Sequence, residues 1–251
     1  MVGPLPRFAE PKLTRNGAQV VTELGVHVPK QPPLPDLIEP ESLGVVDRSQ
    51  HEPLVLVEHP RISVLGNYRL AGWSHAMEPT WLRSSAMDRL AQAADSLPDR
   101  WGMCVFDAWR PLDLQAELYD AAYADPDLPP GFVSPADPDP RTPPPHLTGG
   151  TVDASLTLDG IALGLGADFD DFTARARADA IEAEPGVDRE LRRLLYWTMR
   201  RVGFVVLDCE WWHFEYGTRR WAAITGRCPL FGPASPPLGS SRPGLSTDQG
   251  A

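Results

Sequence analysis

A pair of short motifs in the second half of the chain constrains its fold more than any other feature. The first motif reads HLTGGTVD and places His146 and Asp153 seven residues apart, and the second reads EWWH and runs from Glu210 to His213. Two imidazoles and one carboxylate form the kind of ligand set with which catalytic zinc sites keep a fourth position for water. A spare carboxylate beside the last ligand can take a proton from that water. A fold that uses these residues together must bring both segments to one point.

Each motif alone has a plainer interpretation. A His and an Asp at this spacing are usually a surface pair, and EWWH reads as a core strand with charged ends. A third segment, FDAWRP at residues 106–111, follows an apolar run and places Arg110 at the exit of a strand. Arg110 alone would suggest a structural salt bridge to Asp107 or Asp113, and Glu210 could orient a ligand His instead of acting as a base.

The three segments, in this order, resemble those of the D-alanyl-D-alanine dipeptidase family, the vancomycin-resistance type of zinc dipeptidase. That family shows Asp-x-aromatic-Arg-Pro, then Ser-x-His-x-x-Gly-x-Ala-x-Asp, then Glu-Trp-Trp-His. The resemblance extends from about Asn67 to Tyr216 and includes GADFD at residues 166–170, which is similar to the family's Gly-Thr-x-Phe-Asp. Pro144 stands where the family has Ser, and Thr151 where it has Ala.

The resemblance implies a hedgehog/D-Ala-D-Ala peptidase-like fold and one Zn²⁺ per chain. It also implies a hydrolase that cleaves a small dipeptide such as D-Ala-D-Ala, a reaction of cell-wall metabolism. By this resemblance the metal ligands are His146, Asp153 and His213. Glu210 is the catalytic base, Arg110 the oxyanion donor and Asp170 the carboxylate that binds the ammonium group. Asp168 and Asp171 lie close to Asp170 in the sequence, and either could be mistaken for the matching residue. We assign no role to the four remaining histidines.

Two other functions stay open. Pro144 has neither a hydroxyl nor an N–H, so any hydrogen bond that the family's Ser makes to substrate is lost here. A biosynthetic member of the family acting on another small dipeptide or amide is therefore one alternative. A non-catalytic zinc-holding binding domain, like the hedgehog signalling domain, is the other, although such a domain needs neither Glu210 nor Arg110.

Composition limits the partners. The 251 residues carry a net charge of −11, which disfavours nucleic acid and anionic membranes as partners. No apolar run approaches the roughly 20 residues of a membrane span. Residues 1–19 lack a basic patch followed by an apolar stretch, so we expect a cytoplasmic protein without a secretory signal. Cys104 and Cys209 lie in apolar runs, and we expect them to be reduced core residues.

The order of the predicted elements indicates an α+β fold with a mainly antiparallel sheet packed against helices. We expect strands at 54–57, 62–65, 101–106, 151–158, 204–207 and 211–216, and helices at 79–97, 112–124 and 188–202. The arginines of the last helix are expected to form a solvated face.

The 28 prolines divide the chain. They predict an extended N-terminal arm over residues 1–45, a catalytic domain over 46–231 and a disordered tail over 232–251. A further proline-rich segment, 126–145, is expected to be a stiff loop that closes the pocket.

Overall fold

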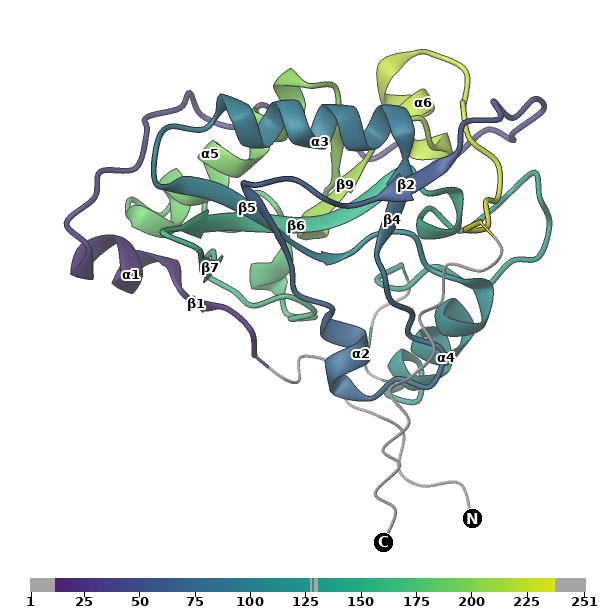
Figure 1. Ribbon diagram of the computed structural model, residues 1–251, viewed down its shortest axis with the longest axis horizontal. Coiled ribbons are helices and arrows are strands. Elements are labelled where there is room, and N and C mark those ends of the chain that lie inside the picture. Colours follow the sequence, from purple (N-terminus) through teal and green to yellow (C-terminus); the bar gives the residue numbers. More distant parts are fainter. Residues whose placement is uncertain (1–11, 127, 129–130, 238–251) are drawn as a thin grey trace, which may run out of the picture.

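The protein is built around one mainly antiparallel sheet (Figure 1). The computed structural model describes residues 12–126, 128 and 131–237. Strands β5 (Trp101–Asp107) and β6 (Thr151–Leu158) form the centre and run antiparallel. The other edge of β6 pairs with β9 (Glu210–Glu215) near its start and with β7 (Ile161–Gly164) near its end. The remaining strands are β8 (Val205–Leu207) beside β9, β3 (Ile62–Val64) parallel to β5, β1 (Arg15–Asn16) parallel to β7, and the separate antiparallel pair of β2 (Leu54–Leu56) and β4 (Trp81–Arg83).

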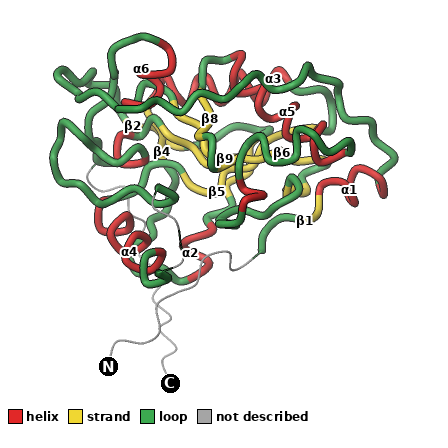
Figure 2. Tube along the Cα trace, turned by 180° about the vertical axis from the view of Figure 1, so that it is seen from behind, coloured by secondary structure: helices red, strands yellow, loops and turns green. Residues whose placement is uncertain are grey.

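Helices cover this sheet from two sides. Helices α3 and α5 contact each other and the central strands on one side, whereas α2 and α4 lie on the opposite side in both views (Figures 1 and 2). The α-helices are α1 (Gly17–Glu23), α2 (Asn67–Ala71), α3 (Ser84–Ser96), α4 (Leu112–Ala122), α5 (Val187–Arg201) and α6 (Arg219–Thr225). The predicted α+β class with a mainly antiparallel sheet is confirmed.

The helix α3 shows why these residues form these elements. Its buried residues Ala86, Leu90, Ala93 and Ala94 recur at helical spacing and form one apolar stripe. Leu90 is completely buried, and removing such a side chain from water contributes about 1.5–3 kcal/mol. The stripe packs against β5 and α5, so burial of this face, together with the helical spacing, holds α3 in place.

The sequence prediction of a helix from residue 79 was wrong over its first turn. Residues Trp81–Arg83 form β4, paired in antiparallel register with Leu54–Leu56. The Arg83 N–H also donates to the Gly149 carbonyl at 2.8 Å, so this strand connects β2 to the loop before β6. Tertiary pairing overrides helical spacing here, and α3 begins only at Ser84.

Part of the predicted N-terminal arm is regular structure. Helix α1 packs against α5, with its first turn capped by the Asn16 side chain. Residues 26–40 contain no helix or strand and run beside α5, where the Trp197 indole donates to the Pro32 carbonyl at 2.9 Å. The arm is therefore extended only after α1.

The first residues of the predicted tail are held by the domain. The Gly232 N–H donates to the Ser49 hydroxyl, and the Ala234 N–H donates to the Leu147 carbonyl, both at 2.9 Å. The expectation of disorder from residue 232 was thus wrong for these positions. Residues 238–251 lie outside the described residues.

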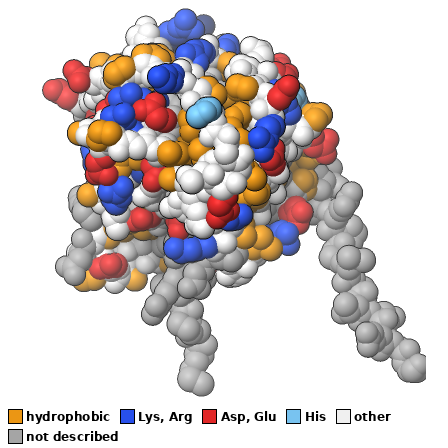
Figure 3. Space-filling view, turned by 90° about the vertical axis from the view of Figure 1, so that its left-hand side faces the viewer, with side chains coloured by type: hydrophobic (Ala, Val, Ile, Leu, Met, Phe, Trp, Pro, Cys, Tyr) orange, Lys and Arg blue, Asp and Glu red, His pale blue; other side chains and the backbone are white. Residues whose placement is uncertain are grey.

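The sequence predicted that the arginines of α5 form a solvated face, but not all of them are solvated. Arg192 is buried, and its guanidinium donates to the carbonyls of Leu165, Arg177 and Arg175. On the face shown in Figure 3, acidic and basic side chains are interspersed with apolar ones.

Cys104 is buried, Cys209 half-buried and Cys228 exposed, and all three are free thiols. None of the helices in the described part of the chain has the length and apolar character needed to cross a membrane.

Candidate active site

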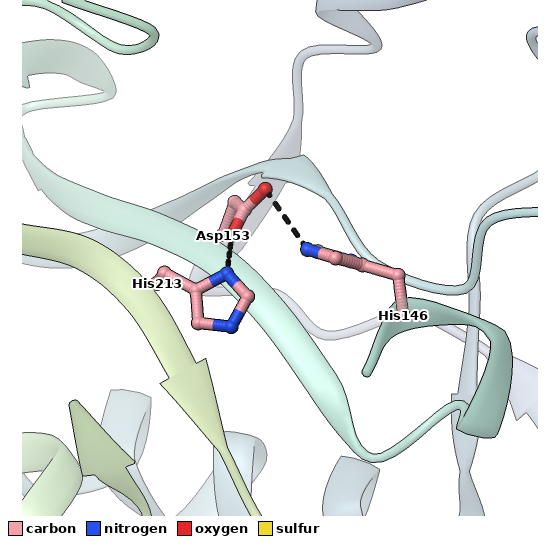
Figure 4. A group of neighbouring side chains, drawn as sticks. All are labelled: His146, Asp153 and His213. Carbon is pink, nitrogen blue, oxygen red and sulfur yellow. Dashed lines mark ion pairs between the residues drawn. The ribbon is translucent and has the colours of Figure 1, made fainter. Parts of the chain in front are cut away.

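Strand pairing brings two of the predicted ligands together. Asp153 in β6 is the direct cross-strand partner of His213 in β9, and on its other side it pairs with Asp107 at the end of β5. Such partners hold their Cβ atoms about 4.5–5.5 Å apart. The Asp153 Oδ1 atom lies 3.0 Å from His213 Nδ1 (Figure 4). Backbone pairing at the centre of the sheet therefore sets this geometry.

His146 approaches from a short 3-10 helix, His146–Thr148, just before β6. Two glycines make the turn between this helix and the strand. Gly149 has φ +73°, and a Cβ on Gly150 would lie 2.2 Å from the Tyr216 carbonyl oxygen, so neither position accepts a side chain without strain. The turn places His146 Nε2 3.4 Å from Asp153 Oδ2 (Figure 4).

The three side chains fit a metal ion. One donor atom from each of His146, Asp153 and His213 lies within 4.8 Å of the others, and all three residues are buried. We assign His146 Nδ1–H as the donor to the Ala108 carbonyl at 2.6 Å and His213 Nε2–H as the donor to Glu215 at 3.2 Å. Such outer hydrogen bonds fix the tautomer and leave the other nitrogen of each ring to face a metal.

Asp153 completes this donor set. Its buried Oδ1 atom lies 3.0 Å from His213 Nδ1, and its Oδ2 atom lies 3.4 Å from His146 Nε2, so both carboxylate oxygens face a ring nitrogen that could bind the same cation. Burial alone would raise the pKa of Asp153, but His146 and His213 outweigh burial and lower it. Asp153 is therefore ionised in the absence of metal and is ready to act as a ligand.

Glu210 lies beside this group at the start of β9. Its Oε2 atom is 3.6 Å from His213 Nδ1, close enough to share the same space but outside the three-residue set. Burial, reinforced by the charge of Asp153, raises the pKa of Glu210 to about 7, although His213 opposes the shift. A carboxylate that titrates near neutral pH can both accept and return a proton.

Arg110 is held rigidly at the exit of β5. Its Nε donates to Asp107 at 2.8 Å, its Nη1 to the Gln115 side chain at 2.9 Å, and its Nη2 to the Tyr68 hydroxyl at 3.3 Å. The salt bridge to Asp107 that the sequence suggested is thus present, whereas the described structure contains no ion pair with Asp113. The same guanidinium reaches Asp153, with Nη2 3.7 Å from Oδ2.

Asp170 lies in the same cavity, and its two acidic neighbours do not. Asp168 is half-buried and bound to Thr14 and Lys12, and Asp171 accepts from the Thr173 N–H. Asp170 is buried with φ +55°, a left-handed conformation that Asp tolerates better than most residues.

Tyr68 is a neighbour of Asp170 that sequence reasoning did not assign. Its hydroxyl lies 3.5 Å from Asp170 Oδ1 and also receives the hydrogen bond from Arg110. Burial, followed by the charges of Asp153 and Glu210, raises the pKa of Asp170 well above the ordinary value. A cationic group entering the cavity would therefore be attracted to this carboxyl and favour its ionised form.

These groups line one cavity of about 60 Å³. The proline-rich loop contributes Gly131–Ser134 and Pro145 to its wall. Five polar lining residues were not predicted: Tyr68, Gln115, Ser134, Glu215 and Arg220. Glu215 had a usable signal, since it lies two residues after His213 on the same strand face. Arg220 lies on α6, a helix that the sequence analysis also missed.

Comparison with known proteins agrees with this arrangement. A family model described as D-ala-D-ala dipeptidase matches residues 82–225, which is more than half of the chain. The D-alanyl-D-alanine dipeptidase of Synechocystis sp. is 30% identical over 201 residues, covering 66% of this chain and 79% of the relative. The D-alanyl-D-alanine dipeptidase of Escherichia coli is 35% identical over 114 residues, covering 45% of this chain and 54% of the relative.

The matched segment contains the three predicted ligands, Glu210, Arg110 and Asp170. It also contains the 3-10 turn and the β6–β9 pairing that bring the ligands together. The chain therefore belongs to the D-Ala-D-Ala dipeptidase family, and it is a metallopeptidase.

Proposed function

We propose that this protein is a zinc-dependent dipeptidase that hydrolyses the peptide bond of a small dipeptide such as D-Ala-D-Ala. The observation that carries the proposal is the convergence of a His-Asp-His donor set, a free carboxylate and a held arginine in one small cavity. A set of three protein ligands is typical of zinc sites that keep a position for water or substrate. The small size of the cavity supports a small substrate.

In this proposal Glu210 moves the proton. Zinc bound by the three ligands would supply a Lewis acid that polarises the scissile carbonyl and makes water more acidic. Glu210 takes a proton from the attacking water and passes it to the amine that leaves. Its position 3.6 Å from His213 Nδ1 supports this role, because it borders the donor set without joining it.

Arg110 stabilises the oxyanion. Three contacts, to Asp107, Gln115 and Tyr68, hold its guanidinium before substrate arrives. A donor that is already oriented requires little reorganisation as negative charge develops on the carbonyl oxygen.

Asp170 binds the substrate's ammonium group, with Tyr68 beside it. A buried carboxyl in a cavity rich in acidic groups is poorly stabilised on its own, and a cationic ligand relieves that cost. This is the ammonium end of the proposed substrate.

A second candidate function is hydrolysis of another small dipeptide or amide, and one observation supports it. Pro144 offers no hydrogen-bond donor, and it lines a neighbouring cavity instead of the catalytic one. A hydrogen bond that a serine hydroxyl would offer to the substrate is therefore missing here, which supports a different substrate preference with the same chemistry. A non-catalytic zinc-binding domain is less well supported, because it would need neither a carboxylate at Glu210 nor a rigid Arg110.

The test is a panel of the four stereoisomers of Ala-Ala, incubated with zinc-loaded protein, with release of free alanine measured. We expect hydrolysis of D-Ala-D-Ala in preference to L-Ala-L-Ala and none by the Glu210→Ala variant. Cleavage of another dipeptide but not D-Ala-D-Ala would support the second candidate. Absence of cleavage of every dipeptide by protein that retains zinc would overturn the proposed function.

A further inference from the structure

The catalytic cavity contains a second arginine with no role in the chemistry described so far. Arg110 and Arg220 are the two arginines that line it among the described residues. The three nitrogens of the Arg110 guanidinium are all bound, to Asp107, Gln115 and Tyr68. Arg220 comes from the first turn of α6 and lines the cavity next to Glu215.

The guanidinium of Arg220 is only partly occupied. Its Nε donates to Glu215 Oε1 at 3.1 Å, and its Nη1 is paired with the carboxylate of Glu39 from the N-terminal arm. Its Nη2 donates to no acceptor in the part of the chain that the structure describes. The side chain is 15% exposed, so this unused donor belongs to a largely buried cation at the cavity wall.

Arg220 and Asp170 line the same cavity but contact different residues of it. His213 turns its Nδ1 toward Asp153 and its Nε2 toward Glu215, which is the residue that Arg220 binds. Asp170 instead contacts Tyr68, on the side of Arg110. A zwitterionic ligand that crosses the donor set can thus meet an anionic group at one end and a cationic group at the other.

We propose that Arg220 binds the C-terminal carboxylate of the substrate through Nη2 and so makes the enzyme selective for a free carboxylate. This inference rests on the proposed dipeptidase function and gives the orientation of the substrate, with its ammonium at Asp170 and its carboxylate at Arg220. An N–H of a guanidinium and a carboxylate form a charge-assisted hydrogen bond, which is stronger than one between neutral groups. Pro145 and Pro144, which lie in the adjoining loop, have no N–H to offer that carboxylate.

A purely positioning role for Arg220 makes a different prediction. Arg220 and the Thr218 hydroxyl both bind Glu215, and Glu215 holds the His213 ring. If Arg220 only kept this chain of contacts in place, its loss would weaken every substrate to the same degree. The ratio between two ligands that differ only in the terminal carboxylate separates the two roles.

The experiment measures binding of D-Ala-D-Ala and of its C-terminal amide to the zinc-loaded Glu210→Ala variant by calorimetry, with hydrolysis of both measured in the wild-type protein. The free acid is expected to bind about 10- to 100-fold more tightly than the amide, the scale of one charge-assisted interaction. Adding Arg220→Gln should bring that ratio close to one. Arg220→Lys keeps a cation beside Glu215 but has no second nitrogen equivalent to Nη2, and it should lose most of the preference.

Arg219→Gln is the matched control, because Arg219 is the adjacent arginine on α6 but lines only the neighbouring cavity. It should keep the full preference. An unchanged ratio in both Arg220 variants, or equal loss of both ligands, overturns the carboxylate role even if wild-type protein cleaves D-Ala-D-Ala. If wild-type protein neither binds nor cleaves any dipeptide, the proposed function itself fails, and the carboxylate role fails with it.

Discussion

Asp153 and His213 face each other across the β6–β9 pairing, with Asp153 Oδ1 3.0 Å from His213 Nδ1. Both belong to the three-residue group that fits a metal, yet they are 60 positions apart in the sequence. Because hydrogen-bonded strands hold them, their separation changes little unless the centre of the sheet unfolds. A donor set placed in this way is organised before the metal binds.

The first prediction concerns metal content. We expect one zinc per chain in the wild-type protein and loss of zinc in His213→Ala, because that change removes one of three protein ligands. His75→Ala serves as the control, since His75 is half exposed and pairs with Glu117 outside the site. Elemental analysis of dialysed protein gives the stoichiometry. Full zinc retention in His213→Ala would show that the ligand set is wrong.

The second prediction concerns pH. In metal-free protein, burial lowers the pKa of His213, but hydrogen bonds to Asp153 and Glu215 outweigh burial and raise it to about 10. His213 therefore carries a proton at neutral pH, and zinc has to displace it. We expect release of about one proton per zinc at pH 7.5, with affinity falling about tenfold per unit of decreasing pH.

Calorimetry in two buffers of different ionisation enthalpy measures that proton release. With rising pH the stability of the metal-free fold falls, whereas the zinc affinity rises. The reason is that a pKa raised in the folded state favours the protonated form of His213, from which zinc has to displace the proton. The contribution of His213 to the stability of the metal-free fold is fully present below pH about 6.5 and is lost as the pH rises through about 10. Zinc binding without proton uptake or release at pH 7.5 would contradict the prediction.

The third prediction separates the base from the ligands. Glu210→Ala should keep zinc and the fold but reduce kcat by about a hundredfold or more, the usual scale for a general base. Steady-state kinetics and metal analysis of the same sample give both results. Zinc loss in Glu210→Ala would instead make Glu210 a ligand, or a residue that orients one.

The fourth prediction concerns Arg110. Its replacement by Ala should lower kcat by about 10²–10³ with a much smaller rise in KM, because an oxyanion donor acts mainly in the transition state. Lysine should restore little activity, since it cannot reproduce the contacts to Asp107, Gln115 and Tyr68 at once. Thermal unfolding is needed beside the kinetics. Loss of stability with nearly normal kcat would return Arg110 to the structural salt bridge that its sequence context also suggested.

The sequence could group His146, Asp153 and His213, which lie together in the structure, because they occur in short motifs with fixed spacing. The segment from His146 to Asp153 consists of a short helix, a glycine turn and the start of a strand, all of which are local features. Tyr68 and Gln115 escaped prediction for the opposite reason. Tyr68 reaches Arg110 from 42 positions away through the packing of α2 against β5, and Gln115, although only five residues from Arg110, belongs to no motif that marks it for this contact.

The errors in secondary structure have the same origin. The apolar spacing of α3 continues back through Leu82, so the sequence alone could not show that residues 81–83 pair with β2 instead. Ala234 lies in a segment of Pro, Ser and Gly, a composition typical of disorder. Its carbonyl nevertheless accepts a hydrogen bond from the Trp109 indole at 3.0 Å, and its N–H binds the Leu147 carbonyl. These contacts depend on partners more than 80 residues away.

The last prediction tests how the ammonium group is recognised. An N-acetylated dipeptide should be a poor substrate, because it has no charge to pair with Asp170 and would leave that buried carboxyl without a cationic partner. Asp170→Asn should reduce the preference for free over acetylated dipeptide while zinc content stays at one per chain. Asp168→Asn is the matched control, since Asp168 lies two residues away, bound to Thr14 and Lys12 outside the cavity.

The ratio of kcat/KM for the two substrates measures this preference directly, and any general loss of activity cancels in it. Equal cleavage of the free and acetylated dipeptides by wild-type protein would show that Asp170 does not bind the ammonium group. The cavity would then have to accept a substrate whose chain continues on the N-terminal side of the dipeptide, as in an amidase or a hydrolase of longer peptides. The carboxylate preference assigned to Arg220 would be unaffected, because that arginine contacts Glu215 and has no contact with Asp170 within the described structure.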